Sequence, residues 1–411
     1  MEIFTILFIL GVVYGVGLLF ERLGQPPILG ELLAGLVIGP PILGLVGKAS
    51  QEGLIGTPMF EWTPSMDTLA TLGMFFLMFY AGLASDPKML GKMKKTILGV
   101  GTFGTIVPLI FGILVGLYFT NDFWQAVFIA IAISGTSLVT KARILDDLGI
   151  LRSKIGHTMI GGAMIDNILS FMLLAVVLNA ATTGTIEVFE VLKTLIVVAA
   201  FFEIALFLGY RVFPWAKKLF AYPGARGFTF ALVMGLLIAS IGELIGLHFI
   251  IGAYLAGLFV REEFIGEAFK DLNKRFQTLS HGFLGPIFIT SVAFHVRLEV
   301  LWTYTPFLTA LLLAAIFGKI IGAGGGGYLT GLKRRDALIV GIGMNGRGTV
   351  ELILALIGAG VYVGGSPIFS DVHVSLLVFT SFVTTLMVPI VLKRLCRKQI
   401  THRLFEEETL V

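Results

Sequence analysis

Long apolar runs follow one another along almost the whole chain, and they constrain its fold more than any other feature. Runs that could cross a bilayer lie at residues 2–20, 28–46, 68–84, 96–118, 124–144, 156–180, 191–213, 226–245, 247–260, 282–296, 302–325, 337–360 and 374–392. Backbone polar groups in lipid must be satisfied within the protein, and runs of this length are typical of membrane helices. The sequence therefore predicts an all-α polytopic membrane protein of about 13 transmembrane helices.

The composition excludes several functional classes. Charged residues make up 14% of the 411 residues and the mean hydropathy is +0.94, whereas soluble domains carry about 25% charge. No phosphate-binding loop is present, which argues against a nucleotide-driven pump. The single cysteine, Cys396, excludes an intrachain disulfide and a cysteine-based metal site. We expect no enzymatic activity, no cofactor and no nucleic-acid partner.

The distribution of basic residues predicts the orientation in the membrane. Most of the 30 Lys and Arg fall in alternate loops, beginning with Arg22 in the first, and in the tail after Leu392. Lys141, Arg143 and Lys154 are assigned to one of these loops. The positive-inside rule then places the N-terminus outside and the C-terminus in the cytoplasm, which requires an odd number of helices. The first run lacks a signal-peptide pattern, so we expect a retained helix.

The sequence also repeats itself. The segment ILGELLAGLVIG matches FIIGAYLAGLFV when Gly30 is set on Gly252, and LGMFFLMFYAGL matches LGPIFITSVAFH with Leu72 on Leu284. The partners are an odd number of helices apart, which reverses their direction in the membrane. We therefore predict two inverted six-helix repeats, about 1–180 and 226–396, joined by a linker helix at 191–213.

Two predicted helices are interrupted at matching positions of these repeats. ISGTSLVTK places Thr136 and Ser137 within one apolar run, and GMNGRGTVE places Gly346 and Gly348 within the other. Unwound backbone is tolerated at membrane depth where it lines a cavity or is buried in protein. Broken helices at corresponding positions are typical of a transporter binding site. Ordinary hydrogen bonding between helices is an equally good interpretation of Thr136 and Ser137 alone.

A few charged residues lie inside the apolar runs. Asp166 and Lys319 fall on different helices, and we expect them to pair because an isolated charge at the bilayer centre costs on the order of 2.5–3.5 kcal/mol. A purely structural ion pair is the alternative. Arg347 and Glu351 stand four residues apart on one helix, so we expect them to neutralise each other and support the broken helix. The glycine run at 322–327 is interpreted as close helix packing.

These motifs together resemble bacterial monovalent cation:proton antiporters. The resemblance rests on GQPPILGELLAGLVIGP, GTSLVTKARILDDLG, the acid in the sixth run, YLAGLFV, FGKIIG and GIGMNGRGTVEL, and it covers about residues 10–395. The most similar branch contains the NapA-like sodium/proton antiporters and the membrane part of the Kef-type potassium/proton antiporters. The regulatory nucleotide-binding domain of Kef-type members is not expected, because only a short tail at 397–411 follows.

The resemblance implies a specific architecture and mechanism. It implies an NhaA-like antiporter fold with two crossing unwound helices, and a single transporter unit at 1–396 in an inner bacterial or archaeal membrane. Core helices at about 68–180 and 282–396 would move like an elevator past scaffold helices at about 1–46 and 191–260, which form a homodimer. Thr136 and Ser137 match cation-site positions, and Lys319 matches the lysine that pairs with an acid. The transported ions would be H⁺ and Na⁺, Li⁺ or K⁺.

The chain departs from the family at the acid pair. Members typically show Asp-Asp, Asn-Asp or Gln-Asp there, and the second residue binds the cation, whereas this chain has Asp166-Asn167. With one carboxylate, a cation and a proton would compete at Asp166, which predicts electroneutral exchange with Asn167 as a neutral ligand. Two other functions stay open: a sodium- or proton-coupled transporter of another solute, and a membrane sensor that has lost the second acid and transports nothing.

Overall fold

The computed structural model describes residues 2–48, 54, 56–85, 94–151, 153–183, 196, 200, 219–220, 222, 225–245, 247–261, 265–363 and 365–396. The first half of the described chain contains α1 (Glu2–Arg22), α2 (Pro27–Ile38), α3 (Pro64–Leu83), α4 (Lys94–Thr120), α5 (Phe123–Ser134), α6 (Leu138–Asp147) and α7 (Lys154–Thr183). The second contains α9 (Ala225–Leu244), α10 (Phe249–Phe259), α12 (Ala268–Leu279), η2 (Ser280–Leu284), α13 (Gly285–Ala293), α14 (Val300–Thr303), α15 (Thr305–Lys319), η3 (Ile320–Gly324), α16 (Gly325–Leu329), α17 (Arg334–Gly343), α18 (Thr349–Gly360) and α19 (Asp371–Leu395).

Short strands lie in the connections between helices. β1 (Val46–Gly47) pairs in parallel with β2 (Phe60–Glu61), and β3 (Tyr362–Val363) pairs antiparallel with β4 (Ser366–Pro367). Each sheet has two strands and closes a connection outside the long helices. The described chain is therefore a helical membrane protein, as the apolar runs predict.

Most of the predicted spans contain a helix where the structure describes them, but residues 39–46 of the span at 28–46 are not helical. In the described residues, 8 helices are long and apolar enough to cross a membrane, and α2, α10 and α18 are shorter apolar helices. The predicted linker at 191–213 lies outside the described residues, apart from Ile196 and Ala200. The predicted span at 282–296 is the end of a longer helical segment through α12, η2 and α13. α12 escaped the hydropathy pattern because only one face of it, with Leu272 and Phe276, is buried.

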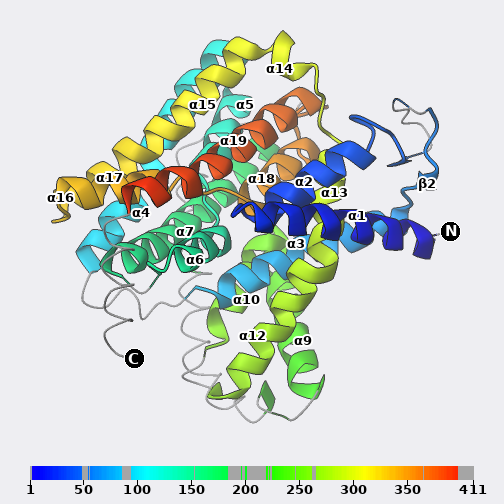
Figure 1. The fold of residues 1–411 in the computed structure, drawn as a ribbon, viewed down its shortest axis with the longest axis horizontal. Coiled ribbons are helices and arrows are strands. Elements are labelled where there is room, and N and C mark those ends of the chain that lie inside the picture. Colours follow the sequence, from blue (N-terminus) through cyan, green and yellow to red (C-terminus); the bar gives the residue numbers. More distant parts are fainter. Residues whose placement is uncertain are drawn as a thin grey trace.

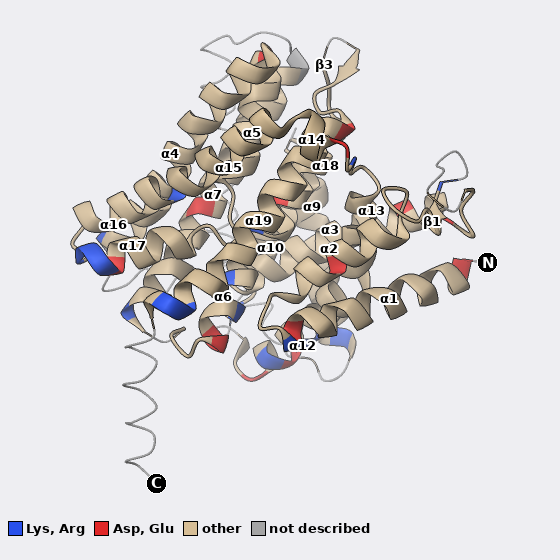
Figure 2. Cartoon of the chain, turned by 45° about the horizontal axis from the view of Figure 1, so that its top comes forward, with Lys and Arg blue, Asp and Glu red and all other residues tan. Residues whose placement is uncertain are grey.

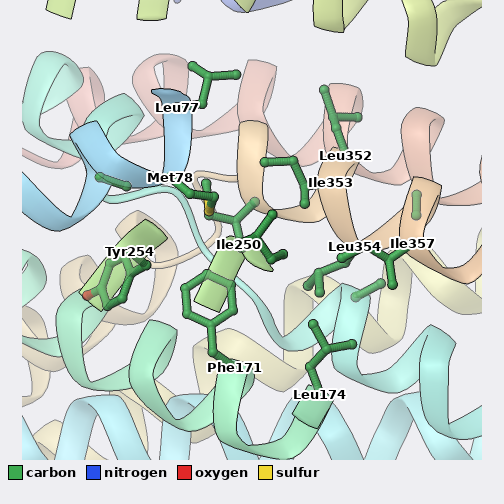
Figure 3. Packing of buried hydrophobic residues seen from close by; sticks show 14 of the residues in the cluster. Leu77, Met78, Phe171, Leu174, Ile250, Tyr254, Leu352, Ile353, Leu354 and Ile357 are labelled. Atoms are coloured by element: carbon green, nitrogen blue, oxygen red, sulfur yellow. The ribbon is translucent and has the colours of Figure 1, made fainter. Parts of the chain in front are cut away.

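The helices form two groups around a shared apolar core. In Figure 1, α4, α5, α7, α15 and α19 lie together at one side, and α3, α9, α10 and α12 lie together at another. Figure 3 shows the core between them, where Phe171 of α7 faces α10 with Ile250 and Tyr254, near Leu354 of α18. All four side chains are buried. This core thus contains buried side chains of α7, α10 and α18.

Glycines let several helices approach closely. A Cβ added at Gly82 of α3 would stand 2.8 Å from the backbone nitrogen of Leu258, and one at Gly257 of α10 would stand 2.9 Å from that of Leu83. In the predicted glycine run, a Cβ at Gly322 would lie 3.0 Å from the carbonyl carbon of Phe103 in α4. The interpretation of this run as a packing surface is thus confirmed for the contact with α4.

The surface separates apolar from basic regions. Large apolar side chains of α1, α4, α9 and α15 are exposed, including Phe4, Leu114, Leu237 and Phe317, as expected of faces toward lipid chains. Figure 2 shows Lys and Arg gathered at one side of the molecule, near α6, α12 and α17. Lys141 is an exception, and its assignment to a loop is wrong. It lies on α6 and is 2% exposed, because α6 continues the apolar run inward to the break at Ser137.

Candidate functional site

Two broken helices meet at their interruptions. α5 ends at Ser134 and α6 begins at Leu138, while α17 ends at Gly343 and α18 begins at Thr349. The backbone N–H of Ser137 donates to the carbonyl oxygen of Gly346 at 3.2 Å, which joins the two interruptions directly. Half-helix ends carry partial charges of opposite sign, and their free carbonyl and N–H groups can bind ions. The structure thus brings together the two segments that the sequence predicts to be interrupted.

The local sequence explains where the helices stop and restart. The Ser137 hydroxyl accepts from the backbone N–H of Thr140 at 3.2 Å, which caps the start of α6. On the other helix, a Cβ at Gly348 would stand 2.8 Å from the Thr140 hydroxyl oxygen. A side chain there would require the Thr140 side chain or α6 to shift. Gly348 therefore lies in close contact with the start of α6.

A buried ion pair lies beside this crossing. The Lys319 Nζ stands 3.0 Å from each carboxylate oxygen of Asp166, and both side chains are 0% exposed. The same ammonium donates to the carbonyl oxygen of Gly104 at 2.8 Å, so its three protons each have an acceptor. The Thr105 hydroxyl lies 2.6 Å from Asp166 Oδ1 and 2.9 Å from the carbonyl oxygen of Gly101. α4 therefore supplies a backbone acceptor and a hydroxyl to a pair made by α7 and α15.

A second buried pair lies on α18 and the segment before it. Arg347 Nη1 is 3.4 Å from Glu351 Oε1, and the two side chains are 0% and 1% exposed. The backbone N–H of Arg347 donates to the Thr385 hydroxyl of α19 at 3.1 Å. Within the described part of the chain, Arg347 Nε and Nη2 and Glu351 Oε2 have no hydrogen-bond partner. The pair lies at the break, and three of its polar atoms make no hydrogen bond to a described residue.

Lys141 is a third buried basic group at the crossing, which sequence reasoning missed. Its Nζ donates to the carbonyl oxygen of Gly346 at 3.1 Å, the same oxygen that accepts from the Ser137 N–H. Asp166, Lys319 and Arg347 are the charged groups that act on it electrostatically. In the part of the chain that the structure describes, no carboxylate lies within ion-pair distance of Lys141. Its position four residues after the Gly-Thr-Ser interruption was the signal that could have distinguished it from the basic residues of the loops.

Neutral polar side chains around the crossing also lack partners. Both amide atoms of Asn167 and the hydroxyls of Thr136 and Ser170 are buried and make no hydrogen bond to any described residue. An unpaired buried polar group costs about 1–3 kcal/mol, so such groups usually meet water or a ligand. These oxygens are the hard donor type that alkali and alkaline-earth cations prefer. Asn167 and Thr136 were predicted as site residues, whereas Ser170, one turn after Asn167, was not.

A cavity of about 600 Å³ reaches the crossing from the surface. Ser137, Thr140 and Thr349 of the broken helices line it, as do Glu31 of α2 and Tyr80 of α3. The acidic residues Asp146 and Asp147 line it at the end of α6. Asp166, Asn167 and Lys319 are not among its lining residues in the described part of the chain, and neither are Lys141 and Gly346.

Comparison with known proteins identifies the kind of protein that this chain resembles. The family model described as "Sodium/hydrogen exchanger, transmembrane" matches residues 5–398. The chain is 30% identical over 342 residues to the probable Na⁺/H⁺ antiporter GerT of Bacillus cereus, covering 82% of this chain and 85% of that one. It is 29% identical over 381 residues to the Na⁺/H⁺-K⁺ antiporter GerN of Bacillus cereus, covering 92% of each.

A solved structure shares the fold. The sodium proton antiporter MjNhaP1 of Methanocaldococcus jannaschii superposes with a TM-score of 0.71 over 97% of this chain and 98% of that one, at 17% identity. The names of these relatives are those of ion antiporters and not of enzymes. The resemblance inferred from the motifs is therefore confirmed at the level of the superfamily.

Proposed function

The chain belongs to the transmembrane sodium/hydrogen exchanger family, and we propose that it exchanges a monovalent cation, Na⁺ or K⁺, for a proton. Asp166 is the group at which cation and proton compete, and Lys319 is its charge partner. The relatives named as Na⁺/H⁺ and Na⁺/H⁺-K⁺ antiporters support this class of substrate. The transported ions are substrates of the chain, and the proposal includes no resident cofactor.

The observation that carries the proposal is the fully buried Asp166–Lys319 pair beside two interrupted helices. A pair of this kind can be opened by a cation that binds the carboxylate, because the cation replaces the charge of the ammonium. The lysine can then release its proton, which an arginine at the same place would not do. The pair therefore links cation binding to proton release within one site.

The neutral oxygens beside the pair complete the proposed cation site. Asn167, Thr136 and Ser137 contribute oxygen ligands, and Arg347, Glu351, Gly346 and Gly348 support the crossing segments. The unpartnered amide of Asn167 and hydroxyl of Thr136 favour a ligand at this place. Since Asn167 adds no charge, one cation replaces one proton, and the exchange is electroneutral.

The inverted repeat and the count of 13 helices are part of the same proposal, with the helix at 191–213 as the link. The packing of repeat partners supports it. A Cβ at Gly30 would stand 2.7 Å from the Val16 carbonyl oxygen of α1, and one at the matching Gly252 would stand 2.7 Å from the Ile238 carbonyl oxygen of α9. Each glycine thus packs its helix against the helix before it, as a two-fold relation requires.

The cavity supports the proposed movement of a core past a scaffold. Its lining includes Pro27 and Glu31 of α2, which belongs to the proposed scaffold at 1–46. It also includes Ser137 and Thr140 of the proposed core at 68–180. We assign the second core segment to 282–396, the rest of the scaffold to 191–260, and a homodimer contact to that scaffold. The basic side of the molecule in Figure 2 is assigned to the cytoplasm of a bacterial or archaeal cell.

The experiment that tests this function uses purified protein in liposomes with a trapped pH dye. Li⁺, Na⁺ or K⁺ is added outside, and proton movement is followed for the wild type, for Asn167→Asp and for empty liposomes. We expect at least one cation to drive protons across the wild-type membranes, and Asn167→Asp to need less of that cation because it adds a carboxylate. No proton movement with the wild type, at any of the three cations, would contradict exchange and favour the sensor alternative.

A further inference from the structure

We propose that Lys141 acts as a tethered competitor of the transported cation: its ammonium occupies the freed carbonyl of Gly346 and lowers the affinity of the crossing for alkali ions. The inference rests on the proposed exchange function and assigns a further residue that determines its ion affinity.

The first argument is the position of the ammonium. Gly346 lies in the interruption between α17 and α18, where carbonyl oxygens have no helical partner. Lys141 Nζ is 3.1 Å from the Gly346 oxygen, and the Lys141 side chain passes Gly346 at van der Waals distance, since a Cβ there would stand 3.4 Å from Lys141 Cγ. A carbonyl oxygen at a half-helix end is a ligand that suits an alkali cation. The lysine therefore places a positive charge where such a cation would find an oxygen.

The second argument is the charge balance of the buried groups at the crossing. The buried charged groups at the crossing are Asp166 with Lys319 and Glu351 with Arg347, which form two ion pairs, and Lys141. Among the described residues, Lys141 is the member of this set that has no carboxylate within ion-pair distance. Three basic and two acidic side chains leave an excess of one positive charge when all are ionised. A cation entering the crossing is repelled by that excess.

The third argument is access. Ser137, which donates its backbone N–H to the same Gly346 oxygen, and Thr140, the residue before Lys141, both line the cavity that opens to the surface. The Gly346 oxygen and the Lys141 ammonium do not themselves line this cavity in the described part of the chain, but each adjoins a residue that does. Lysine can give up its proton and with it its charge, whereas arginine keeps its charge. The competition between the Lys141 ammonium and the transported cation therefore weakens as the pH rises, so exchange is favoured at alkaline pH.

The test compares Lys141→Gln, Lys141→Met and Lys141→Arg with the wild type in liposomes, with Lys154→Gln as the control at the start of α7. The apparent KM for the transported cation is measured at several pH values. We expect both neutral variants to lower KM by at least about tenfold at low pH and to flatten its pH dependence, because the competing charge is gone. Lys141→Arg should keep a high KM at every pH. The Lys154 control should match the wild type.

Cation binding measured as thermal stabilisation of the detergent-solubilised protein gives a second readout that does not need transport. The neutral variants should be stabilised at lower cation concentrations than the wild type. If they exchange or bind cations with unchanged concentration and pH dependence, Lys141 is not a competitor, although the proposed function stands. If the wild type neither binds nor exchanges any alkali cation, the proposed function itself fails.

Discussion

Three residues from outside α7 stabilise the buried carboxylate of Asp166 or its ion-pair partner. Lys319 of α15 binds both carboxylate oxygens, the Thr105 hydroxyl of α4 is 2.6 Å from one of them, and the carbonyl of Gly104 takes the third proton of the lysine. Removing one member of a buried pair leaves an uncompensated charge, whereas removing both leaves only neutral groups. The pair is therefore expected to behave as a unit in stability as well as in transport.

A double-mutant cycle tests that unit. Asp166→Asn and Lys319→Gln should each lower the free energy of unfolding by about 3–5 kcal/mol, because each leaves a buried charge without its partner. The double variant should be destabilised by clearly less than the sum. Thermal unfolding of the four proteins in one detergent measures this, and a double variant whose loss equals the sum of the single losses would show that the pair is not coupled.

Sequence reasoning identified some of these residues and not others, for physical reasons. Asp166, Lys319, Arg347 and Glu351 were predicted because a charge within an apolar run is costly and has few explanations. Thr105 carries no such signal, since a threonine beside glycines in a membrane helix usually bonds its own backbone. The sequence predicts a loop position for Lys141 because hydropathy alone does not distinguish a polar helix that is buried in the protein, such as α6, from a polar loop outside the membrane.

At the scale of helices, the position of Lys319 depends on the contact of its own helix with α4. Gly318 and Gly322 lie on either side of the lysine in the sequence. A Cβ added at Gly318 would stand 2.8 Å from Pro108 Cα of α4, and a Cβ added at Gly322 would stand 3.0 Å from Val107 Cβ of the same helix. α4 also provides Gly104 and Thr105 to the pair. The glycine contact and the ion pair are thus two consequences of one close helix packing.

Alanine substitutions within the glycine run at 322–327 distinguish the effect of close helix packing on stability from the effect of helix propensity. Gly322→Ala should push η3 away from α4, lower stability by about 1–3 kcal/mol and impair exchange by shifting Lys319. Gly325→Ala is the matched control, because a Cβ there meets nothing within 4 Å and alanine favours a helix. Unfolding temperature and exchange rate measured side by side check this, and equal effects of the two substitutions would contradict the packing argument.

The helices themselves were largely predictable, because runs of apolar residues fix where a chain can cross lipid. The two interruptions were also predicted, from glycines and hydroxyls inside apolar runs. The manner in which they meet, with the Ser137 N–H on the Gly346 oxygen, depends on residues about 200 positions apart and follows only from the folded chain. The same holds for α12, whose single buried face escapes a hydropathy pattern.

At the scale of the whole molecule, the proposed site carries one carboxylate fewer than an Asp-Asp pair would. Transport of one cation for one proton moves no net charge, so its equilibrium should not depend on the membrane potential. In liposomes with the potential clamped at several values, the cation gradient that balances a given pH gradient should stay constant for the wild type. Asn167→Asp adds a charge to the site and should make this balance depend on the potential. A wild-type balance that shifts with the potential would contradict the proposed stoichiometry.

The central claim is that Asp166 is the group at which cation and proton exchange, and it can be tested by one paired measurement. Cation-driven proton flux is followed in liposomes that contain equal amounts of the wild type, Asp166→Asn and Asp146→Asn. Asp146 is the matched control, an exposed acid of α6 that lines the cavity but takes no part in the buried pair. We expect flux from the wild type and from Asp146→Asn, and none from folded Asp166→Asn. Flux that persists in Asp166→Asn would contradict the account.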